Sequence, residues 1–156
     1  MLHARYQPRV LLLAVLSLQV ACTHHRLSQR QRTAAYLVAL RIVSRDVRGD
    51  PPGGPLALDT RLLPSPGSPD TVLDAGTARV LAGSLALLPV HAAYRGLVAS
   101  VSGLRRLHGG DVALRAAVHG RAAPGDNTVI LGPPYQAEFE LAPADSTWRV
   151  VRKKRL

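Results

Sequence analysis

Alternating apolar and polar residues near the carboxyl end constrain the fold more than any other feature of the chain. Apolar residues take every second position in two runs: Val112, Leu114, Ala116 and Val118, then Tyr135, Ala137, Phe139 and Leu141. A period of two places such residues on one face of a half-buried strand. Turn residues at 124–127 and 143–146 separate the strands, and Val129–Leu131 begins the second strand before a bend at 132–134. The pattern predicts an antiparallel meander of three to four strands.

The last turn also predicts how the final two strands pair. A four-residue turn over 143–146 places Leu141 opposite Trp148 and Phe139 opposite Val150. The other face of the same register sets Glu140 against Arg149, so apolar residues meet on one side and opposite charges on the other. The residues predicted to face inward are almost all apolar: Val112, Leu114, Ala116, Val118, Tyr135, Ala137, Phe139 and Trp148.

The amino-terminal half has helical spacing in two stretches. Apolar residues share one helical face in the first stretch: Tyr36, Leu40, Val43 and Val47. Ser28 and Gln31 have the spacing of a capping box, so we predict a helix over about Gln29–Val47. Thr71–Leu88 predicts a second helix, which Pro89 ends or kinks.

Two further segments have weaker patterns. Leu56–Asp59 alternates as a short strand, and His91–Leu107 is interpreted as a short helix or a loop containing one. Helices that precede an antiparallel meander make an α+β fold.

The last hairpin resembles a known family. Tyr135–Leu141 (YQAEFEL), a turn and Ser146–Val151 (STWRVV) resemble the final hairpin of nuclear-transport-factor-2-like or cystatin-like proteins, whose last strand often has a Trp followed by alternating Val. The resemblance implies a sheet curved into a cone. That fold includes enzymes, binding modules and many uncharacterised envelope proteins, so the resemblance implies no particular activity.

The amino terminus has the three zones of an export signal. Arg5 and Arg9 give a positive start, Val10–Leu18 is apolar except for Ser17, and Gln19–Cys22 ends in small residues. The apolar run is about half as long as a bilayer-spanning helix. The sequence therefore predicts a signal peptide over 1–22, a polar connector over 23–28 and a single small α+β domain over 29–156. Such a protein is exported, and in a bacterium it is periplasmic or associated with the outer membrane.

Cys22 is the single cysteine of the chain, so no disulfide can form within it. Val20-Ala21-Cys22 resembles the lipobox of bacterial lipoproteins, in which the cysteine becomes the first residue and carries the lipid. The sequence departs from that pattern at Gln19, where the family has Leu or another aliphatic residue, so ordinary cleavage near Ala21 or Cys22 stays open. The resemblance implies a membrane partner, reached through a lipid anchor on Cys22.

The chain is strongly basic, with 20 Lys and Arg residues against 10 Asp and Glu and a net charge of +10. Nucleic acids and anionic membranes both suit such a balance. The arginines are spread from Arg26 to Arg155, and the sequence lacks a cluster of basic residues with stacking aromatics, so we expect no nucleic-acid partner. The terminal run Arg152–Arg155 fits either contact with lipid headgroups or, as we favour, an exposed strand end whose charges hinder edge-to-edge pairing.

The sequence lacks recognisable catalytic and phosphate-binding motifs. It has neither Gly-x-Ser-x-Gly nor a phosphate-binding loop. The histidines match no metal-binding spacing and are interpreted as ordinary: His24, His25, His91, His108 and His119. Glu138 and Glu140 share a strand face and could form an acid pair, but an ion pair with Arg149 also accounts for Glu140. We expect no catalytic, cofactor-binding or metal-binding residue.

These observations favour an exported, lipid-anchored envelope protein with a binding or structural role. The alternative is a small enzyme or apolar-ligand binder with a pocket inside a curved sheet. A solid core would favour the first function, and a deep cavity with a buried His or Asp would favour the second.

Overall fold

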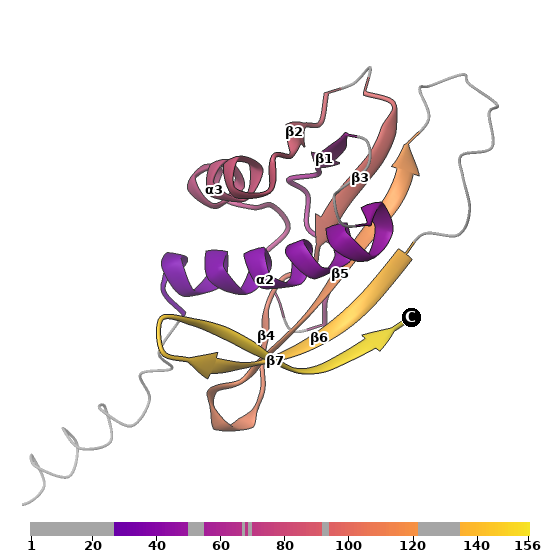
Figure 1. Ribbon diagram of the computed structural model, residues 1–156. Helices are drawn as coiled ribbons and strands as arrows, with labels where there is room; N and C mark the ends of the chain where they lie inside the picture. Colours follow the sequence, from indigo (N-terminus) through magenta and orange to yellow (C-terminus); the bar gives the residue numbers. More distant parts are fainter. Residues whose placement is uncertain (1–26, 50–54, 67, 69, 92–93, 122–134) are drawn as a thin grey trace, which may run out of the picture.

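The computed structural model describes residues 27–49, 55–66, 68, 70–91, 94–121 and 135–156 (Figure 1). Within these residues the chain forms two helices and a mixed seven-stranded sheet, which confirms the predicted α+β class. The leader over 1–22, most of the connector, and the turn and strand start predicted over 124–134 lie outside the described residues.

Helix α2 (Gln29–Arg48) begins where the sequence predicts and ends one residue later than predicted. The backbone N–H of Gln31 donates to Ser28 Oγ at 3.2 Å, and the Ser28 N–H donates to Gln31 Oε1 at 2.9 Å, so the capping box is complete. The helix buries one side along its length: Ala35, Tyr36, Ala39, Leu40, Val43 and Ser44. The cap residue that follows, Gly49, has a φ of 78°, which glycine adopts without steric cost.

Helix α3 (Ala75–Leu85) is shorter than predicted, and both predicted ends are wrong. The Asp74 carboxylate is the reason for the later start, because it accepts hydrogen bonds from Thr77 N at 2.9 Å and Thr77 Oγ1 at 2.7 Å and so caps the helix. Ala86 adopts a φ of 50° and ends the helix, and strand β2 (Leu88–Pro89) follows. Pro89 therefore lies in a strand beyond the helix rather than at its end.

The interpretation of His91–Leu107 as a helix or loop is wrong, because this segment contains strands β3 (Gly96–Val101) and β4 (Arg105–Arg106). Strand β3 lies inside the sheet, parallel to β1 (Leu56–Leu58) on one side and antiparallel to β5 (Val112–Arg121) on the other. Its last four residues are buried on both faces of the sheet. A strand buried on both faces has no apolar–polar alternation, which is the signal by which the other strands were predicted.

The predicted meander is confirmed by β5 (Val112–Arg121), β6 (Tyr135–Ala144) and β7 (Thr147–Arg155), which pair antiparallel in that order. The short 3-10 turn His108–Gly110 precedes β5. The residues predicted to face inward are buried as expected, except for Tyr135, which is half-buried.

The predicted register of the last hairpin is wrong by two residues. Leu141 faces Val150, and Trp148 faces Pro143, because the turn consists of Asp145 and Ser146 alone. Asp145 has a φ of 47°, a conformation that Asp tolerates better than most residues. A shift of two residues keeps each side chain on its predicted face, so the apolar pattern survives the error.

A β-bulge between Glu140 and Leu141 then moves the remaining pairs by one residue. Beyond it, Glu140 lies opposite Arg152 and Phe139 opposite Lys153. The predicted pairs of Glu140 with Arg149 and of Phe139 with Val150 are therefore wrong.

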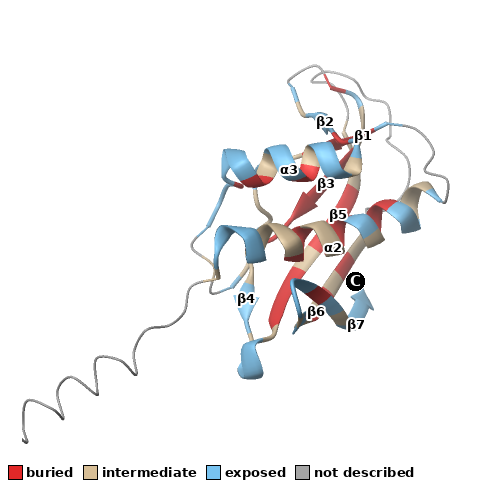
Figure 2. Ribbon diagram, turned by 60° about the vertical axis from the view of Figure 1, so that its left-hand side comes forward, coloured by how far each residue is buried: buried red, intermediate tan, exposed pale blue. Residues whose placement is uncertain are grey.

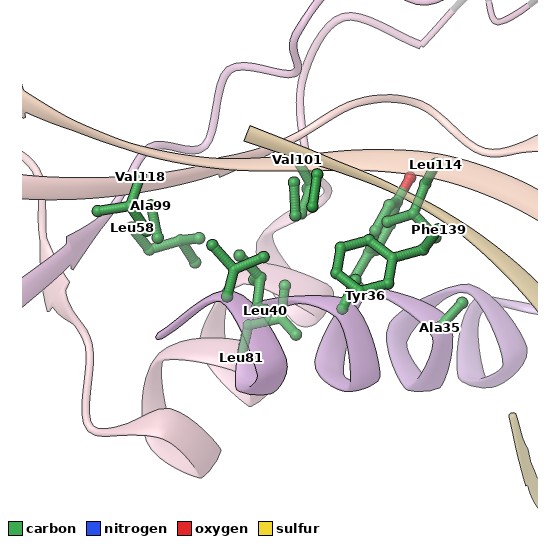
Figure 3. Packing of buried hydrophobic residues seen from close by; sticks show 14 of the residues in the cluster. Ala35, Tyr36, Leu40, Leu58, Leu81, Ala99, Val101, Leu114, Val118 and Phe139 are labelled. Atoms are coloured by element: carbon green, nitrogen blue, oxygen red, sulfur yellow. The ribbon is translucent and has the colours of Figure 1, made fainter. Parts of the chain in front are cut away.

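The strands lie in the order β2-β1-β3-β5-β6-β7, with β4 beside β5. Both helices pack against one face of this sheet, which twists but is not strongly curled (Figure 1). We call this the covered face and the opposite one the outer face. Figure 3 shows Leu40 of α2 and Leu81 of α3 directed at the strands, with Phe139 packed beside α2.

Candidate functional site

The sequence-predicted lipidation site, Cys22, lies outside the described residues, as do His24 and His25. Neither of the two helices that the structure describes is both long and apolar enough to cross a membrane.

The three histidines that the structure describes are not brought together. His91 follows β2 and stacks edge-on against Tyr94, with 6.1 Å between ring centroids. His108 precedes β5, and His119 lies near the far end of that ten-residue strand. Among the described residues, no group of three His, Cys, Asp or Glu side chains is placed to hold a metal ion.

Glu138 and Glu140 do share the outer face, and each has a basic partner. Glu140 accepts a hydrogen bond from Arg152 Nη1 at 3.3 Å, and Glu138 lies 3.9 Å from Arg105 Nη2. Lys154 is the cross-strand neighbour of Glu138. Both carboxylates therefore lie in ion pairs on the surface of the sheet, which accounts for their positions without an acid pair.

The basic run Arg152–Arg155 forms the exposed end of β7, the edge strand of the sheet, as the favoured interpretation predicts. The alternating pleat divides the run between two faces. Arg152 and Lys154 join the outer face beside Glu140 and Glu138, whereas Lys153 and Arg155 point to the side of α2.

Asp46, Tyr135 and Lys153 form a hydrogen-bonded polar cluster. The Tyr135 hydroxyl donates to Asp46 Oδ2 at 2.5 Å, and Lys153 Nζ donates to the same oxygen. The guanidinium of Arg155 lies over the Tyr135 ring, 5.0 Å from its centroid. The cluster joins the carboxyl end of α2 to the ends of β6 and β7.

The pKa shifts of Asp46, Tyr135 and Lys153 indicate a structural cluster rather than a proton-transfer site. Burial alone would raise the pKa of Asp46, but hydrogen bonds from Lys153 and Tyr135 outweigh it and hold that pKa below its ordinary value. Burial and the Asp46 carboxylate raise the pKa of Tyr135, and the hydrogen bond to Asp46 raises the pKa of Lys153. At neutral pH the carboxylate is therefore charged, and both partners remain donors.

Tyr36 is the most perturbed titratable group described. Burial, followed by the negative charge of Asp70, raises its pKa to about 12. Its ring lies in the core between α2 and the sheet (Figure 3). A phenol with this pKa stays protonated at neutral pH and cannot act as a base there.

Open hollows occur on both faces of the molecule. A hollow of about 400 Å³ with a mixed polar and apolar lining lies on the outer face, lined in part by Arg105, Arg115 and Glu138 and by the segment at Ser65 and Pro66. A second hollow, of about 440 Å³, is a mainly apolar groove between the helices. We call it the helix groove, and its lining residues are Gln29, Arg30, Thr33, Ala34, Leu37, Gly76 and Val80.

Beside the helix groove runs a row of arginines that the sequence interpretation missed. Arg30, Arg41 and Arg45 are exposed and share the outward side of α2, opposite its buried side; we call them the arginine stripe. Their spacing of 11 and then 4 residues was the available signal, since it equals three turns and then one turn of a helix. Three of the arginines that are spread along the chain therefore share one side of this helix.

Comparison of the chain with family models, curated proteins and solved structures found no match.

Proposed function

We propose that the protein is exported across the inner membrane of a bacterium and is held in the cell envelope by a lipid on Cys22, where it has a binding or structural role. The leader carries this proposal, because Arg5, Arg9, the apolar run Val10–Leu18 and Cys22 occur in the order of a lipoprotein signal. The start of the domain supports it. Ser28 and Gln31 cap α2 on their own, six residues after Cys22, so a chain cut at Cys22 keeps its first helix intact.

The solid core also favours a binding or structural role. Within the described residues, the inward side chains of β5 and β6 pack in one apolar cluster with α2, and Val112, Ala116, Ala137 and Phe139 are fully buried. The alternative, an enzyme or apolar-ligand binder with a pocket in a curved sheet, has less support, because the helices fill the space that such a pocket would need. We propose that the hairpin resemblance to nuclear-transport-factor-2-like or cystatin-like proteins reflects a related arrangement, a helix across a meander, with a less curved sheet.

Intact-mass spectrometry of the protein purified from its host tests the proposal. We expect a chain that begins at Cys22 and carries acyl groups, and we expect Cys22→Ser to move the protein from the membrane fraction to the soluble fraction. A chain that is cut near Cys22 but carries no acyl groups would support export and contradict the lipid anchor. A cytosolic protein that still begins at Met1 would overturn both.

A further inference from the structure

The outward surface of the two helices combines positive charge with apolar side chains. The arginine stripe runs along α2, and Arg79 and Val80 are exposed on α3 beside it, Val80 to 49%. Between them lies the helix groove, with Ala34 and Leu37 in its lining. Figure 2 shows the exposed sides of both helices turned away from the buried strands.

Acidic residues do little to neutralise this surface. The one acid of α2, Asp46, is bonded to Tyr135 and Lys153 at the opposite side of the helix end. Asp74, at the edge of the helix groove, caps α3 and accepts a hydrogen bond from Gln29. The stripe therefore faces solvent as a row of cations over an apolar groove.

We propose that this helix surface rests on an anionic lipid bilayer. Guanidinium groups bind phosphate headgroups, and the apolar side chains between them can enter the boundary of the acyl chains. Single-stranded nucleic acid is the less suitable partner, because it needs aromatic stacking platforms. The groove lining is aliphatic and polar, and Tyr36, the aromatic residue of α2, is buried on the other side.

The position of the proposed anchor agrees with this docking, and to that extent the inference rests on the proposed function. Leu27, which packs against the core, lies five positions after Cys22, and five residue steps span at most about 18 Å. A lipid on Cys22 would thus keep the first turn of α2 and the groove near the membrane. The outer face of the sheet would then point away from it.

Vesicle co-sedimentation of the full chain carrying Cys22→Ser tests the surface without the lipid. The probes are vesicles of phosphatidylcholine alone and of an equimolar mixture with phosphatidylglycerol. We expect salt-sensitive binding to the mixed vesicles only. Reversing Arg30, Arg41 and Arg79 to Glu should lower that binding at least tenfold, since each arginine near an anionic surface contributes roughly a factor of five.

The matched control reverses Arg105, Arg149 and Arg152, which lie on the outer face and give the same change in net charge. All variants keep the same amino terminus, so any retained leader affects them equally. Circular dichroism checks folding, and an Arg→Gln series replaces any variant that does not fold. Equal loss in both variants, greater loss in the control, absence of binding to mixed vesicles, or tighter binding of the parent to single-stranded RNA would each overturn the inference. The vesicle result does not depend on acylation, so the two proposals can fail separately.

Discussion

The two faces of the sheet use the same strands for different purposes. On the covered face, β5 and β6 contribute fully buried residues such as Leu141 and Phe139 to one apolar core. On the outer face, the alternate positions of β6 and β7 carry charges that meet across the strands, Glu140 with Arg152 and Glu138 with Lys154. Burial of a large apolar side chain stabilises a fold by several kcal/mol, whereas an exposed ion pair contributes about 0–1 kcal/mol. The covered face thus determines stability, and the outer face contributes charge and pairing preference.

Replacing Phe139 with Ala should produce the largest effect. Phe139 is fully buried in the core on the covered face, and its removal leaves a cavity that the packed helices cannot close. We expect a loss of about 3–5 kcal/mol in the free energy of unfolding, measured by urea denaturation. Val151→Ala is the control, because Val151 lies on β7 and is 56% exposed; it should change stability by less than about 0.5 kcal/mol. Similar losses in the two variants would contradict the contrast between the faces.

Asp46→Asn tests the border of the covered face, where α2 meets β7, and should have an intermediate effect. Asp46 keeps 25% of its side chain exposed, so solvent screens its pair with Lys153 and we expect a loss of about 1 kcal/mol or less at neutral pH. Its lowered pKa makes this contribution present above the ordinary value of 3.8 and lost as the pH falls through the lower, folded-state value.

Lys153, the basic partner of Asp46, sets the upper pH limit of this contribution to stability. The raised pKa of Lys153 makes its contribution complete below 10.5 and lost as the pH rises through the higher, folded-state value. The free energies of unfolding of wild type and Asp46→Asn should therefore differ most between these two pH limits and converge at lower and at higher pH. Urea denaturation measured over a range of pH checks this. A difference that does not change with pH would show that the carboxylate acts only through packing.

The sequence was sufficient where a local signal agreed with the environment of the segment in the fold. Ser28 and Gln31 gave the start of α2, and the two-residue period gave β5 and β6, because each of these elements has one buried side. Strand β3 was missed because its neighbours bury both of its faces, which only tertiary structure determines. The hairpin register was missed because it depends on the left-handed backbone of Asp145 and on a bulge after Glu140.

The candidate sites also divide into those with a local signal in the sequence and those that only the fold brings together. Cys22 was found from the local order of the leader and stays a prediction, since it lies outside the described residues. The cluster of Asp46, Tyr135 and Lys153 joins residues that are up to 107 positions apart, so no local pattern could have predicted it. The arginine stripe was predictable in principle, because its period matches the helix that the sequence already indicated.

The smallest expected effect, a double-mutant cycle on the outer face, tests the register most directly. Glu140 and Arg152 are joined at 3.3 Å, but Arg152 is 63% exposed, so we expect a coupling of only about 0.2–0.5 kcal/mol between Glu140→Gln and Arg152→Gln. The matched cycle pairs Glu140→Gln with Arg149→Gln and should give none, because Arg149 lies opposite Ala142. Both cycles remove the same charges from the same strands, so the difference between them reports the strand pairing alone. Coupling to Arg149 in place of Arg152 would mean a four-residue turn without the bulge. The pairs of opposite charges on the outer face would then differ from those described above.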